Sequence, residues 1–219
     1  MSFAFAMGGL IRGKLDNEWV LTTRRWTLMA WYFLASGLIL GGQWAYEELG
    51  WGGFWAWDPV ENAALMPWLT GTAFLHSVMI QEKRNMLKIW NVVLIITTFG
   101  LTILGTFLTR SGIINSIHSF TQSEIGPAFL IYLALILIAG FALLFKRIQM
   151  LESEYKIESV LCRENVFLAQ NIVLVGIAFT VLLGTTFPLL SEAVRGTKLS
   201  IQAPFFNTIT APMGYALLV

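Results

Sequence analysis

Charged residues are scarce in this chain. They make up 12% of its 219 residues, whereas a soluble domain carries roughly 25%. Hydrophobic residues make up 56%, which is more than one core of this size can bury, so we expect much of that surface to face lipid. The net charge of +1 leaves no basic stripe, and this excludes nucleic acid as a partner.

Cysteine and the common catalytic motifs are also nearly absent. The single cysteine, Cys162, excludes an internal disulfide, a CxxC thiol pair and a CxxCH site for covalent haem within the chain. The sequence holds no HExxH motif, no paired carboxylates and no phosphate-binding loop, so hydrolase and NTPase activities have no support.

Long apolar runs dominate what is present. A bilayer span takes about 20 mainly apolar residues, and backbone groups in lipid must bond within their own segment, which requires a helix. The sequence predicts five full spans and two partial ones, at residues 26–46, 63–80, 89–108, 127–145 and 166–190, and at 2–11 and 215–219. The predicted fold class is an all-α, polytopic transmembrane helix bundle, with residues 1–219 forming part of one transmembrane domain. Because both ends cut through apolar runs, we expect a fragment of a larger protein or one chain of a split one.

Basic residues orient these spans. Eleven of the 14 lysines and arginines lie in alternate loops, between residues 12 and 25, 83 and 88, and 146 and 163. Lysine and arginine collect on the cytoplasmic side of a membrane. The remaining loops are therefore predicted to face outward, at residues 47–62, 109–126 and 191–214.

The first outward loop is rich in aromatic residues, and we predict that residues 46–62 form a ligand-binding extracytoplasmic segment. Four large rings fall within seven positions, at Trp51, Phe54, Trp55 and Trp57, and the glycines among them allow close backbone approach. Aromatic faces stack on planar π systems, and an indole N–H donates hydrogen bonds. A porphyrin, a quinone or a lipid satisfies this chemistry, and so does a plug against a partner protein or the membrane interface.

Acidic residues follow the rings directly. Asp58, Pro59 and Glu61 match the N-cap, N1 and N3 positions of a helix start with a capping box. This pattern predicts that the second span begins there. The alternative is that Asp58 and Glu61 contact a ligand or a partner.

The chain has two histidines. His76 lies inside the predicted span 63–80, where an ionisable group is costly and points to function; a neutral imidazole bonded to a neighbouring helix is the alternative. His118 lies in the outward loop 109–126, where a histidine is usually just solvated. Because the two lie near opposite faces of the membrane, they cannot ligate the same iron.

Several segments together resemble one family. WGGFWAWDPVEN is similar to the WWD domain of haem-handling proteins. The sequence further resembles the CcmF/NrfE family of cytochrome c haem lyase subunits, through the motifs DPVENAALMPWL, GTAFLHS, EKR, LGTFLTRSG and IHSF. The match runs without a break from Ser2 to about Phe120 and stays compatible in spacing to Val219.

The resemblance implies roles for individual residues. His76 would be one ligand of a b-type haem in the membrane, and His118 would be one of two outward histidines that bind haem in transit. The WWD platform for that haem would consist of Trp51, Phe54, Trp55, Trp57 and Asp58. The second ligand of each iron would lie outside this chain, so the chain is not expected to be active alone.

The resemblance also implies an activity. A haem lyase of cytochrome c maturation takes haem from a carrier protein and promotes thioether attachment to the CxxCH of an apocytochrome c on the outer membrane face. A thiol-handling maturation subunit and a membrane quinol would be further partners, in a bacterial inner membrane or a mitochondrial inner membrane.

Two other functions stay open. A transporter of haem or another planar ligand needs polar residues or broken helices along a path, and Pro67 and Pro188 are candidates for such breaks. A structural membrane subunit would instead dock through the Trp loop.

Overall fold

The computed structural model describes residues 1–50, 52–111, 125–152 and 162–218. Within these ranges the regular structure is helical and contains no strand. The elements are α1 (Ser2–Arg12), α2 (Asn17–Glu48), α3 (Pro59–Arg84), α4 (Lys88–Arg110), α5 (Gly126–Lys146), the 3₁₀-helix η1 (Ile148–Leu151), α6 (Arg163–Arg195) and α7 (Ala203–Ala216). The predicted all-α fold class is confirmed.

Four of the described helices, α3, α4, α5 and α6, are long and apolar enough to cross a membrane. Helix α5 is the extreme case, because only 11% of its apolar window is buried inside the bundle, as expected for a helix that faces lipid on most sides. The chain is therefore a polytopic membrane protein. Helix α2 covers the predicted span 26–46 and α1 covers the partial span 2–11; a membrane crossing by either stays a prediction.

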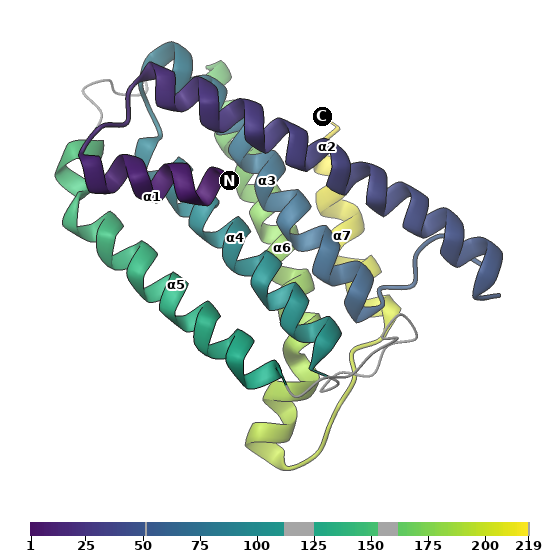
Figure 1. The fold of residues 1–219 in the computed structure, drawn as a ribbon. Coiled ribbons are helices and arrows are strands. Elements are labelled where there is room, and N and C mark those ends of the chain that lie inside the picture. Colours follow the sequence, from purple (N-terminus) through teal and green to yellow (C-terminus); the bar gives the residue numbers. More distant parts are fainter. Residues whose placement is uncertain (51, 112–124, 153–161, 219) are drawn as a thin grey trace.

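Helix α3 lies at the centre of the bundle, and α2, α4 and α6 pack around it (Figure 1). Its inward face carries fully buried apolar side chains such as Met66 and Phe74. Small residues bring α4 close, because a Cβ added at Gly105 would stand 3.2 Å from the backbone oxygen of Ala63. Such close backbone approach is how helices associate where lipid removes the hydrophobic driving force.

Two prolines sit inside long helices without ending them. Pro67 lies within α3 and Pro188 lies within α6, and both helices continue past them. The broken helices on which the transport alternative relied are therefore not found at these two positions.

Candidate functional site

Residues 52–58 lie between α2 and α3, and we call them the aromatic segment. Trp57 has a φ of 60°, a left-handed conformation that is a strained outlier for a bulky residue. Its ring stacks on Phe206 of α7, with centroids 5.0 Å apart and planes 11° from parallel. Its indole Nε1 donates to Oδ1 of Asn207 at 2.7 Å. Trp57 thus fastens the segment to α7, a contact across 150 residues of sequence.

The other described rings of the segment point in different directions. Trp55 meets Trp57 edge-on at 5.8 Å. Phe54 stacks instead on Tyr46 of α2, with ring centroids 4.5 Å apart and planes 10° from parallel. Phe54 is 58% exposed and Tyr46 is 50% exposed, so this pair presents an aromatic surface to the outside of the protein. Trp51 lies outside the described residues.

The acidic residues of the segment start helix α3. The Asp58 side chain accepts from the backbone N–H of Val60 at 3.0 Å. Oε2 of Glu61 accepts from the backbone N–H groups of Ala56 and Asp58, at 3.0 and 3.1 Å. This is the predicted capping box, so that structural interpretation is confirmed. A haem contact by Asp58 stays a prediction.

Asn62 ties the segment to the core, which the sequence did not predict. It is 1% exposed, and its Nδ2 donates to the backbone oxygen of Trp57 and to Oγ1 of Thr185, both at 3.0 Å. Helices α3, α6 and α7 therefore all hold the aromatic segment in place. A segment fixed at so many points presents its exposed rings in a defined orientation.

His76 lies in the second half of α3, eight residues before its last residue, Arg84. Its Nδ1 is buried and has no hydrogen-bond partner within the described parts of the chain. Its ring lies 5.7 Å from the ring of Phe167 on α6, tilted by 58°. A buried imidazole nitrogen in this state needs a functional or structural reason.

A cavity of about 590 Å³ opens between α3 and α6 beside Phe167. Apolar side chains line part of it, Lys83 and Arg84 come from the C-terminal end of α3, and Glu164 of α6 pairs with Arg84 at 3.3 Å. Its lining residues are Met79, Ile80, Lys83, Arg84, Cys162, Glu164, Val166, Phe167 and Gln170. Its volume falls in the range of roughly 300–1,000 Å³ that is usual for small-molecule sites. Apolar walls with basic groups at one end suit a flat apolar ring that carries carboxylates.

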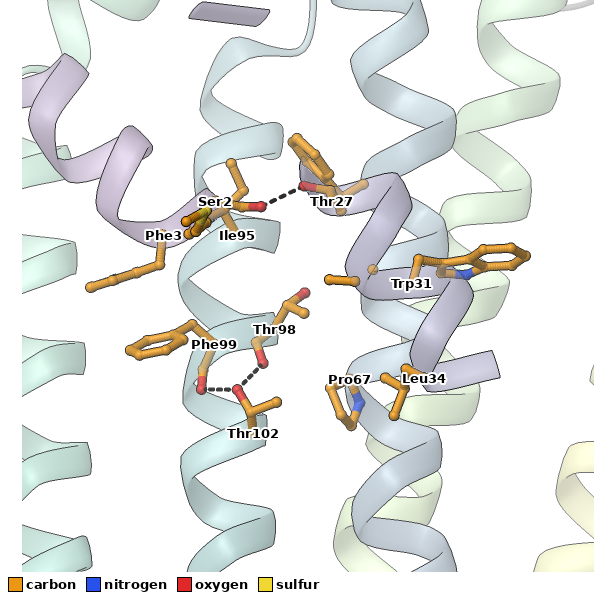
Figure 2. Close-up of a pocket in the computed structure, with 14 residues that line it drawn as sticks. Ser2, Phe3, Thr27, Trp31, Leu34, Pro67, Ile95, Thr98, Phe99 and Thr102 are labelled. Atoms are coloured by element: carbon orange, nitrogen blue, oxygen red, sulfur yellow. Dashed lines mark hydrogen bonds between the residues drawn. The ribbon is translucent and has the colours of Figure 1, made fainter. Parts of the chain in front are cut away.

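A second, smaller cavity lies among α1, α2, α3 and α4 (Figure 2). It encloses about 190 Å³, below the usual range for a drug-sized ligand. Its hydroxyls bond to one another or to the backbone, as in the 2.7 Å contact of Ser2 with Thr27 and the 2.6 Å bond from Thr102 to the Phe99 oxygen. Of these two cavities, the one beside Phe167 is therefore the better candidate for a large planar ligand.

No bare metal ion is indicated in the described part of the chain, where no three His, Cys, Asp or Glu residues form a group that could hold one. His118 lies outside the described residues. Its predicted role therefore stays a prediction.

The family model described as "Cytochrome C assembly protein" matches residues 5–114, a range that holds the aromatic segment and His76. The chain belongs to this family. It is 46% identical over its whole length to "Cytochrome c-type biogenesis protein CcmF" of Pseudomonas aeruginosa, of which it covers 33%. To the CcmF of Escherichia coli it is 45% identical over 95% of this chain and 32% of that protein.

Two further proteins with cytochrome c assembly names are similar to this chain. The "Probable cytochrome c-type biogenesis protein NrfE" of Escherichia coli is 40% identical over 98% of this chain and 39% of its own. A solved structure named "Cytochrome c Heme Lyase CcmF" has a TM-score of 0.77 and 38% identity, over 99% of this chain and 31% of that one. The resemblance drawn from the motifs is confirmed, and the chain spans about a third of the length of most of these relatives.

Proposed function

We propose that this cytochrome c assembly protein carries the haem-handling part of a cytochrome c haem lyase. The observation that carries the proposal is the aromatic segment, which is fixed by the capping box, by Asn62 and by the Trp57 contacts. Such anchoring leaves the exposed Phe54–Tyr46 pair as a rigid stacking surface. Rigid aromatic surfaces hold a planar substrate at low entropic cost.

The chain's residues would act by orienting the substrate haem. The aromatic segment would stack on the macrocycle, and His118 would ligate its iron from the same outer face. Each thiol of the apocytochrome CxxCH then adds across one vinyl group, so that a C–S bond and a C–H bond form while the S–H bond and the C=C π bond are lost. No external oxidant is consumed in this addition. The carrier that supplies haem and the subunit that keeps the thiols reduced are further proposed partners.

A resident b-type haem is the second part of the proposal. The support is that the His76 ring lies 5.7 Å from the ring of Phe167, and Phe167 lines a cavity that has Lys83 and Arg84 among its lining residues. When bound, such a haem supplies one-electron chemistry, which would link a membrane quinol to the redox state of the substrate. His76 would hold the iron, Phe167 would pack near the imidazole, and Lys83 would face a propionate, since Arg84 is paired with Glu164.

The orientation follows from the basic loops. With eleven of 14 lysines and arginines in the alternate loops, the aromatic segment would face the periplasmic or intermembrane side of an inner membrane. Trp57 is engaged by Phe206 and Asn207 of its own chain. This contact disfavours the alternative in which that ring plugs into a partner protein.

The first test replaces His118 by alanine in the intact protein in its host membrane. We expect cytochrome c assembly to fail while membrane insertion stays intact. Gln202→Ala is the matched control, since Gln202 lies at the start of α7 and is exposed, and assembly should continue. Unchanged assembly in His118→Ala would remove that residue from the proposed site.

The second test uses the absorption spectrum of the purified intact protein. His76→Ala should lose the b-type haem signal. A signal of unchanged position and intensity in His76→Ala would show that another residue holds the iron.

A further inference from the structure

Asn171 is a buried side chain whose polar groups are unexplained. It is 0% exposed on α6, and neither its Oδ1 nor its Nδ2 has a hydrogen-bond partner among the described residues. Burying an amide without a partner costs free energy, so such a group in a native helix bundle needs a reason. His76 is in the same state, since its buried Nδ1 also lacks a partner there.

The contacts between α3 and α6 bring these two residues to the same depth. The helices run antiparallel, with Asn62 bonded to Thr185 at one end and Arg84 paired with Glu164 at 3.3 Å at the other. His76 follows Asn62 by 14 residues, and Asn171 precedes Thr185 by 14 residues.

This spacing also places the two residues on facing sides. Fourteen residues are close to four helical turns, so His76 returns to nearly the face of α3 that Asn62 uses, and Asn171 to the face of α6 that Thr185 uses. The 5.7 Å ring contact between His76 and Phe167, one turn from Asn171, agrees with this register.

The two groups are chemically complementary. A neutral imidazole carries one N–H, and an amide oxygen accepts it. A histidine that ligates a metal through one nitrogen usually donates the N–H of the other to such a partner, which fixes its tautomer and ring orientation.

We propose that Asn171 is a positioning residue for the imidazole of His76. The two groups are not bonded in the structure described here; with haem held at His76, the Asn171 Oδ1 accepts from the Nδ1–H, and this holds the tautomer whose Nε2 binds the iron of the b-type haem. The inference rests on the proposed haem site at His76.

The experiment compares haem retention in variants of the intact protein in its host membrane. We expect Asn171→Leu to release haem to apomyoglobin at least about tenfold faster than the unmodified protein, in line with losses of such partners. The midpoint potential of the haem should rise, because an imidazole without an acceptor at Nδ1–H is a weaker donor to ferric iron. Asn171→Asp keeps an acceptor oxygen and should restore retention.

Thr180→Val is the matched control on α6. The Thr180 hydroxyl bonds to the Gly176 oxygen of its own helix at 3.0 Å, so its loss should change neither the release rate nor the potential. An Asn171→Leu protein with unchanged release rate and unchanged potential would overturn the inference.

Two further measurements keep the outcomes distinct. If His76→Ala retains the b-type signal, the proposed haem site itself fails; if His76→Ala loses it and Asn171→Leu changes nothing, only the role of Asn171 fails. If Asn171→Leu does not accumulate in the membrane, nitrogen NMR of the unmodified protein decides. A protonated, hydrogen-bonded Nδ1 in His76 supports the inference, and an unprotonated Nδ1 overturns it.

Discussion

The left-handed backbone at Trp57 predicts that glycine destabilises the protein less than alanine does at this position. Replacing Trp57 by alanine removes the stack on Phe206 and the bond to Asn207. The stack is worth about 0.5–1.5 kcal/mol and the hydrogen bond about 0.5–1.5 kcal/mol. We therefore expect Trp57→Ala to lower the free energy of unfolding by about 1–3 kcal/mol.

Glycine at the same position should be the milder change. Both replacements lose the ring, but alanine must still adopt the φ of 60°, whereas glycine reaches the left-handed region without a Cβ clash. The free energy of unfolding of Trp57→Gly should therefore be about 1 kcal/mol higher than that of Trp57→Ala. At most positions outside the left-handed region glycine is the more destabilising of the two.

The assay is an SDS titration of the purified protein in detergent micelles, followed by circular dichroism. Trp55 is the matched control, since it lies in the same segment and is not among the described residues with positive φ. There, Trp55→Gly should be no more stable than Trp55→Ala. Equal or lower stability of Trp57→Gly relative to Trp57→Ala would refute the argument from backbone strain.

Two further predictions concern the contact of α3 with α4. Gly105→Val should lower the free energy of unfolding in the same titration by about 1–3 kcal/mol, because its Cβ would meet the fixed backbone oxygen of Ala63. Gly37→Val is the control, since a Cβ there meets nothing within 4 Å, and it should lower the free energy of unfolding far less. An equal loss in both variants would contradict the packing argument. Asn91→Leu removes the amide that donates to the buried Oε1 of Gln81 at 2.7 Å, and it should lower the free energy of unfolding by about 1–3 kcal/mol. Thermal unfolding in micelles would detect this loss. An unchanged midpoint temperature would contradict a stabilising role for the Asn91–Gln81 hydrogen bond.

Local sequence chemistry predicted four apolar helices and the start of one of them, α3. Apolar runs predicted the four helices that are long and apolar enough to span a membrane, and the Asp58-Pro59-Val60-Glu61 pattern predicted the capping box. Both depend on residues within a few turns of each other, so the sequence alone carries the information. The family motifs were equally local, and the comparison with known proteins confirmed them.

The partners of the site residues could not be predicted in this way. The sequence offered Trp57 as a free stacking ring, yet Phe206 and Asn207 of α7 engage it. Asn62 was not singled out from the sequence, yet it joins the aromatic segment to Thr185. These contacts bridge more than 120 residues, and they depend on how α6 and α7 pack against α3.

By itself, the sequence determined that this is a membrane helix bundle with an aromatic segment between two helices and a histidine inside an apolar helix. Only the tertiary structure decided which groups face that histidine and what holds the aromatic segment still. The physical reason is the register between antiparallel helices. Side-chain packing along the whole α3–α6 interface sets that register, and no short stretch of sequence encodes it. The proposed pairing of Asn171 with His76 rests on the same register.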